Sequence, residues 1–183
     1  MTQVRLDRFN NSGFKPGPLG KRVTWYLSSI LFLESALPWP GAFKRNLLRL
    51  FGARIGKGVI IKPRVRIKYP WKLSVGHHSW LGEGVWIDNL DMVDIGSHCC
   101  VSQGAYLLCG NHDYTKITFD LITGPITMED GSWAGAQSIL GPGSILGKEA
   151  VLTAGSVGLG RLVHGKIHQG NPAQPIRDRT IAT

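Results

Sequence analysis

The sequence has few cysteines, few acidic residues in its N-terminal part and no long uninterrupted apolar segment. Its three cysteines are an odd number without the spacing of a disulfide framework, and no signal peptide is expected near residue 1, so we expect a cytoplasmic protein. The longest apolar stretch, residues 23–37, contains Glu34 and stops at Pro38, which makes it too short for a membrane-spanning helix. These absences argue against a secreted disulfide-rich domain and against an integral membrane protein.

Acidic side chains are scarce at the N-terminal end. Residues 1–72 hold 15 of the 21 Lys and Arg residues but only Asp7 and Glu34 of the 12 acids, a net charge of +13, whereas the remainder carries −4. This asymmetry predicts one end of the molecule that attracts anionic surfaces or phosphates. No nucleic-acid-binding motif accompanies the charge, so nucleic acid is not expected as a partner.

Apolar residues return every six positions between residues 55 and 157. They form four runs: Ile55, Ile61 and Ile67; Val75, Leu81 and Ile87; Ile95, Val101 and Leu107; and Ala134, Leu140, Leu146 and Leu152. A period of six matches neither a helix nor a strand. It predicts an all-β solenoid whose coils have three short faces of about six residues, each with its aliphatic residue turned inward. The first runs begin 20 residues apart, so each coil there has eighteen residues plus two at a corner.

The N-terminal segment, residues 1–51, is predicted to lie outside the repeat. Residues 1–20 are rich in Gly and Pro and read as an extended arm, and two helices are expected at about 22–36 and 42–51. These helices either cap the open end of the solenoid or lie on an anionic membrane surface. Both interpretations stay open, and they are compatible.

The repeat itself occupies residues 52–160. An inserted loop at 109–125 interrupts it, and insertions at solenoid corners commonly carry a functional site. Residues 161–183 are expected to form a short C-terminal tail.

Several features resemble the hexapeptide-repeat acyltransferases, and most of all the colanic-acid type of exopolysaccharide O-acetyltransferase and the galactoside and maltose acetyltransferase branch. These features are the repeat, the loop Gly110-Asn111-His112 and the stretches 133–136, 154–157 and 170–173. The resemblance implies a left-handed parallel β-helix, a homotrimer, and acetyl-CoA as co-substrate with no metal. It further implies O-acetylation of a sugar hydroxyl on an exopolysaccharide or a lipid-linked saccharide.

His112 is the predicted catalytic residue. A sugar hydroxyl is a weak nucleophile, so its attack on a thioester needs a base whose pKa is near neutral. The resemblance implies direct transfer, with His112 as the general base and a backbone N–H that stabilises the oxyanion. The alternative is a solvated loop histidine.

Asp88, Asn89 and Asp113 are the candidates for binding the acceptor. Asp113 neighbours His112 and is a candidate orienting group, although adjacent residues of an extended loop usually point to opposite sides. Asp88 and Asn89 fall where related enzymes place an Asn near the acceptor and the thioester. The alternative for this pair is a corner whose side chains bond to nearby backbone.

Cofactor contacts are expected in the coils that follow the inserted loop. The resemblance places Ala136 and Ala154, which are eighteen residues apart and so stacked in neighbouring coils, along the pantetheine arm. Trp133 would flank the acetyl group or the arm, or else pack as a corner aromatic. The candidates nearer the phosphates are Gly160, Arg161 and Arg177.

Two other classes were weighed. The γ-class carbonic anhydrases share the solenoid and bind zinc through three closely spaced histidines, whereas His78 and His98 here occupy the same position one coil apart and suit a surface stack. The pair Cys109 and His112 hints weakly at a thiolate site. A non-catalytic solenoid scaffold would need no loop histidine.

Overall fold

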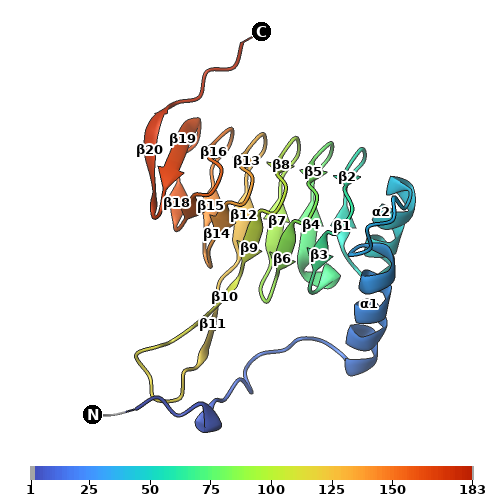
Figure 1. The fold of residues 1–183 in the computed structure, drawn as a ribbon, viewed down its shortest axis with the longest axis vertical. Coiled ribbons are helices and arrows are strands. Elements are labelled where there is room, and N and C mark those ends of the chain that lie inside the picture. Colours follow the sequence, from blue (N-terminus) through green and yellow to red (C-terminus); the bar gives the residue numbers. More distant parts are fainter. Residues whose placement is uncertain (1–2, 183) are drawn as a thin grey trace.

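A computed structural model describes residues 3–182 as an N-terminal arm, two helices and a parallel β-solenoid (Figure 1). The arm contains a short 3-10 helix (Leu6–Arg8) and leads into α1 (Leu19–Phe32) and α2 (Gly41–Leu50). Both helices lie close to the positions expected from the sequence. None of the helices in the described residues is long and apolar enough to cross a membrane.

Three parallel sheets form the faces of the solenoid. The first face contains β1 (Arg54–Ile55), β4 (Leu73–Val75), β7 (Val93–Ile95), β12 (Ile126–Met128), β15 (Ile145–Leu146) and β18 (Arg161–Leu162). The second face contains β2 (Ile60–Ile61), β5 (Trp80–Leu81), β8 (Cys100–Val101), β13 (Trp133–Ala134), β16 (Val151–Leu152), β19 (Lys166–Gly170) and β20 (Ala173–Asp178), the last pair antiparallel. The third face contains β3 (Arg66–Ile67), β6 (Trp86–Asp88), β9 (Tyr106–Leu108), β14 (Ile139–Leu140) and β17 (Val157–Gly158). A 3-10 turn (Pro70–Lys72) lies at the first corner between the third and first faces.

The register confirms the coil lengths read from the sequence. Arg54 pairs with Ser74, 20 residues on, and Thr127 pairs with Ile145, 18 residues on. Every apolar residue of the four predicted runs is buried, and Ile55 is the most exposed of them at only 8%. The core is therefore a column of aliphatic side chains inside the coils, as the period of six predicts.

Close stacking of the coils explains a recurrent glycine. A Cβ on Gly76 would lie 2.5 Å from the carbonyl carbon of Gly96 in the next coil. No side chain fits at such a position without separating the coils. Glycine thus follows the aliphatic residue wherever two backbones meet at a corner.

The N-terminal helices cover the open end of the solenoid. Their side chains donate to backbone carbonyls of all three faces of the first coil: Arg49 to Ile55 (2.8 Å), Arg45 to Val59 (3.0 Å), Lys44 to Lys62 (3.1 Å) and Trp25 to Ile67 (2.8 Å). An uncovered sheet edge invites association with other chains, and these contacts block it. Part of the N-terminal positive charge therefore has a structural role, and the capping interpretation of the helices holds.

Two features depart from the regular coil. The inserted loop forms an antiparallel hairpin, β10 (Gly110–His112) and β11 (Leu121–Thr123), which projects from the corner between the third and first faces (Figure 1). At the other end, β18 pairs with β15 and β19 with β16, so the ladders continue past residue 160, where the repeat in the sequence fades. The residues expected to form a tail thus supply most of one more coil.

Candidate active site

His112 lies at the end of β10, with its imidazole held on two sides. Its Nδ1 is 2.9 Å from the backbone carbonyl oxygen of Phe119, and the Phe119 ring stacks on it at 4.4 Å and 7°. The ring of Phe9, from the N-terminal arm, contacts it at 5.7 Å and 58°. A carbonyl oxygen can only accept a hydrogen bond, so in the neutral imidazole Nδ1 carries the proton. Nε2 is then left with a free lone pair.

Asp113 is turned away from this imidazole. Its Oδ1 accepts a hydrogen bond from the Thr115 N–H at 3.1 Å, and its Oδ2 lies 3.8 Å from the Lys116 ammonium. The hydrogen bond from the Thr115 side chain, first among the causes, lowers the pKa of the Asp113 carboxyl. The group that orients His112 is therefore the Phe119 carbonyl, because Asp113 closes its own turn in the loop.

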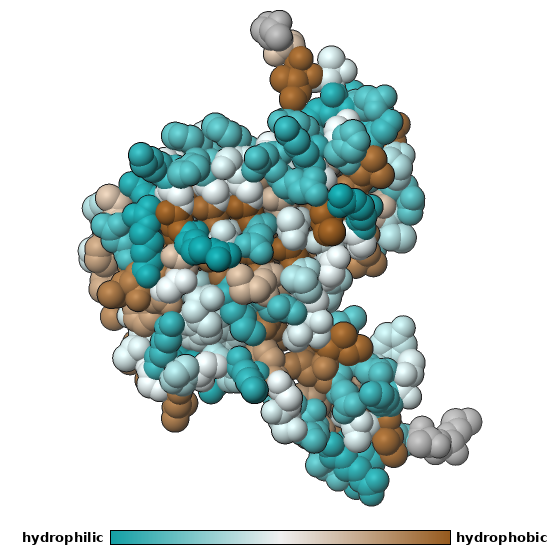
Figure 2. Space-filling model, turned by 180° about the vertical axis from the view of Figure 1, so that it is seen from behind, coloured by the Kyte–Doolittle hydropathy of each residue, from teal (hydrophilic) through white to brown (hydrophobic). Residues whose placement is uncertain are grey.

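A pocket of about 470 Å³ lies between the arm and the hairpin. It is lined on one side by Leu121 and Thr123, and in the antiparallel register Leu121 pairs with His112. Paired residues project to the same face of a hairpin, so the pocket borders the face that carries the imidazole. Its polar groups include Asn10, Lys15, Lys72, Asp91 and Asp120. Figure 2 shows the hairpin and arm as a lobe that a notch separates from the C-terminal coils.

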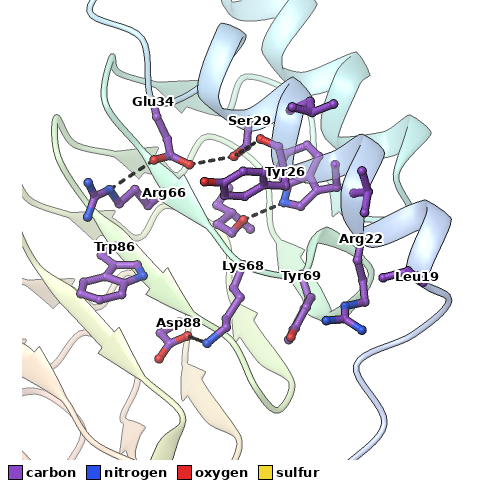
Figure 3. A pocket seen from close by; sticks show the side chains of 14 residues that line it. Leu19, Arg22, Tyr26, Ser29, Glu34, Arg66, Lys68, Tyr69, Trp86 and Asp88 are labelled. Atoms are coloured by element: carbon purple, nitrogen blue, oxygen red, sulfur yellow. Dashed lines mark hydrogen bonds and ion pairs between the residues drawn. The ribbon is translucent and has the colours of Figure 1, made fainter.

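Asp88 lies in a different pocket, of about 520 Å³, between α1 and the strands β3 and β6 (Figure 3). Its carboxylate is 2.9 Å from the Lys68 ammonium and accepts a hydrogen bond from the Tyr106 hydroxyl at 3.4 Å. Burial, followed by the charge of Asp88, raises the pKa of Tyr106 to about 12. The pocket also has an apolar wall from α1, including Val23 and Tyr26. Asp88 is thus placed with Lys68 and not with His112.

Asn89 has the structural role that the sequence left as the alternative. It is fully buried, its Oδ1 accepts the Tyr69 N–H at 2.9 Å, and its Nδ2 donates to the Tyr69 carbonyl at 2.6 Å. Both ends of the amide therefore join two neighbouring coils. In this chain that leaves an acceptor little access to Asn89.

No model of a known protein family matches the sequence, but individual proteins do. The chain is 40% identical over 167 residues to the putative colanic acid biosynthesis acetyltransferase WcaF of Escherichia coli, which covers 91% of this chain and 92% of that protein. The chain belongs to the hexapeptide-repeat acetyltransferase family. Galactoside O-acetyltransferase of Escherichia coli is a more distant relative of this acetyltransferase, 21% identical over 138 residues, 74% of this chain and 68% of that protein.

Solved structures share the fold of this acetyltransferase. A hexapeptide-repeat acetyltransferase from Vibrio cholerae superposes with a TM-score of 0.79 at 20% identity, over 87% of this chain and 90% of that one. A galactoside acetyltransferase solved in complex with coenzyme A gives a TM-score of 0.78 at 21% identity, over 87% and 80%. The architecture is the left-handed parallel β-helix of these enzymes.

The predicted cofactor residues of the acetyltransferase fall in three places. Ala136 and Ala154 stack as expected, because the Gly155 N–H donates to the Ala136 carbonyl at 2.9 Å. They lie at the corner between the second and third faces, next to Trp133, whose indole N–H donates to the Ser102 hydroxyl at 2.8 Å and whose side chain is 44% exposed.

The candidates for the phosphates lie elsewhere. Gly160 and Arg161 stand at the corner between the third and first faces, and the Arg161 guanidinium is 3.5 Å from the Glu129 carboxylate. Arg177 is on β20, opposite Ile167. One chain therefore does not gather these side chains with Ala136 and Ala154.

The cysteines and the remaining histidines give no other reactive centre. Cys109 is fully buried, and burial is the main cause that raises its pKa to about 11, so it is not poised as a thiolate beside His112. His78 and His98 form the expected stack, at 5.3 Å and 21°. Within residues 3–182, no three His, Cys, Asp or Glu side chains converge in a way that could hold a metal ion.

Sequence reasoning missed the aromatic side chains that hold the imidazole. Phe119 is in the inserted loop, but it has no periodic partner that would mark it. Phe9 lies in an arm that looked merely extended. The signal available for each was only an apolar residue inside an otherwise polar segment.

Proposed function

We propose that the protein transfers an acetyl group from acetyl-CoA to a sugar hydroxyl in exopolysaccharide or other cell-surface glycan synthesis. The family and the names of its relatives support the reaction class, since one is a putative colanic acid biosynthesis acetyltransferase and another acts on galactosides. Related folds have been solved with acetyl-CoA and with coenzyme A. The observation that carries the proposal is the His112 imidazole, held by the Phe119 carbonyl so that Nε2 is free.

In the proposed reaction, Nε2 of His112 takes the proton of the acceptor hydroxyl as its oxygen attacks the thioester carbonyl carbon. Collapse of the tetrahedral intermediate breaks the C–S bond, and the proton passes from Nε2 to the departing sulfur. The Phe119 carbonyl accepts the Nδ1–H throughout and so stabilises the transient imidazolium. A base of this kind contributes about 10²–10⁴-fold in rate.

The active site would be completed by a neighbouring copy in a homotrimer. The hairpin with His112 leaves the corner between the third and first faces, whereas Ala136 and Ala154 lie at the corner between the second and third. A partner's hairpin laid along that ridge would bring a histidine to the pantetheine arm. Co-expressed His112→Ala and Ala154→Trp subunits should then recover activity that neither variant has alone. Mixed trimers as inactive as both parents would contradict the shared site.

The pocket between arm and hairpin suits the acceptor. Its amide, carboxylate and ammonium groups can bind a ligand rich in hydroxyls, and it borders the His112 face. A sugar or a lipid-linked saccharide would fit this chemistry. The experiment is to incubate the protein with acetyl-CoA and a panel of glycans and lipid-linked saccharides, and to measure free thiol. Thiol release that no glycan increases would count against sugar acetylation.

A cytoplasmic enzyme acting on lipid-linked acceptors would contact the inner face of the membrane, and α1 offers the surface for it. Its outward apolar side chains include Leu19, Leu27 and Leu31, which are 68%, 55% and 59% exposed, beside Lys21 and Arg22. An exposed apolar stripe flanked by cations suits an anionic bilayer. Leu27→Glu should therefore weaken binding to phosphatidylglycerol vesicles. Equal binding by Leu27→Glu and the wild type would argue against the contact.

A further inference from the structure

The N-terminal arm runs back from α1 to the hairpin and is fixed at both ends (Figure 1). Near α1, Gly17 lies against the Trp71 indole, where an added Cβ would be 3.3 Å from the ring, and the Phe14 ring sits 6.2 Å from that of Tyr69. At the hairpin, the Arg5 N–H donates to the Ile117 carbonyl at 2.8 Å. The arm therefore bridges the solenoid and the tip of the hairpin.

The hairpin needs such a support. It has only three residue pairs, and a two-stranded hairpin is marginally stable on its own. Within this chain, the Phe119 ring covers one side of the His112 imidazole, and Phe9 is the arm residue that contacts it from elsewhere. Phe9 is 38% exposed, so part of its surface is spent on contacts with the chain and part faces solvent.

We propose that the arm is part of the active site, and that Phe9 is a positioning residue that keeps the His112 imidazole in register with the acceptor. This inference rests on the proposed role of His112. Without Phe9 the imidazole is held by Phe119 alone, in a hairpin whose tip keeps only the Arg5 tether. Small displacements of a reacting group cost up to about 10²-fold in rate.

The test compares Phe9→Ala with Leu6→Ala, which removes an apolar side chain from the same arm at a position 64% exposed. Phe9→Ala should lower kcat by about 10-fold or more, with the KM for acetyl-CoA unchanged, because the imidazole is misplaced and the cofactor ridge is intact. Phe9→Tyr keeps the ring and should restore most of the rate. Leu6→Ala should behave as the wild type.

A second readout does not need turnover. The ring protons of His112 lie within the ring currents of Phe9 and Phe119, so their NMR shifts should move in Phe9→Ala and stay in Leu6→Ala. Deletion of residues 3–12, which leaves Phe14 in place, should shift them in the same way. If Phe9→Ala and Leu6→Ala give the same spectra and the same kcat, the inference is overturned. A His112→Ala variant with full activity would instead remove the base assignment, whatever the spectra show.

Discussion

Lys44 offers a direct measure of how much the helical cap stabilises the solenoid. Its side chain is 1% exposed, and its ammonium donates to the Lys62 carbonyl at 3.1 Å and to the Ile61 carbonyl at 3.4 Å. Burial lowers its pKa, which shows that the charge is held at a cost. Lys44→Met keeps the length of the side chain and removes the donor.

The magnitude follows from these contacts. A buried acceptor left without a donor costs about 1–3 kcal/mol, and two carbonyls are affected here, one of them at a long distance. Relief of the buried charge offsets part of the loss. We therefore expect Lys44→Met to lower the free energy of unfolding by about 2 kcal/mol, a fall in Tm of about 4–8 °C for a chain of this size.

The assay is thermal unfolding followed by circular dichroism, with Lys57→Met as the control. Lys57 is an exposed lysine of the first coil, so its substitution should change the free energy of unfolding by less than about 0.5 kcal/mol. If the two variants unfold at the same temperature, the carbonyls of the edge strand do not depend on α2, and the account of the cap is wrong.

Two further predictions concern the C-terminal coils. His168 is buried, its Nε2 accepts the Val163 N–H at 3.1 Å, and burial lowers its pKa below 6.5; the stability that its neutral form provides is thus lost as pH falls through the folded-state pKa. The Tm should drop between pH 7 and pH 5, and His168→Gln should flatten this dependence; an equal slope in both proteins would refute the assignment. Ala154→Trp should raise the KM for acetyl-CoA at least about 10-fold, because an indole on the exposed ridge would occupy the space of the pantetheine arm. An unchanged KM would place the cofactor elsewhere.

The solenoid was predictable because its contacts repeat at a fixed separation. Leu81 and Val101 occupy equivalent places in successive coils, so the apolar pattern alone identifies the residues that face the core. The pattern fades after Val157 because the last coil is shorter: Ile145 pairs with Arg161, only 16 residues on. The continuation of the ladders, with Leu162 buried, could not be read from a period of six.

The site was predictable only in part. His112 could be named from its motif, but the contact with Phe9 joins residues 103 positions apart and leaves no periodic trace. Asn89 shows a second limit, since a corner amide can face a ligand or bond to backbone, and only the fold decides between them. The side to which Asp113 turns depends on Thr115 and Lys116 in the same way.

The role of His112 is tested most directly by single-turnover acetyl transfer with His112→Ala, beside His164→Ala as a surface histidine control. With an acceptor found in the glycan panel, the account predicts a rate about 10²–10⁴-fold lower for His112→Ala, unchanged acetyl-CoA binding by calorimetry, and a wild-type rate for His164→Ala. Transfer by His112→Ala at the wild-type rate would contradict it.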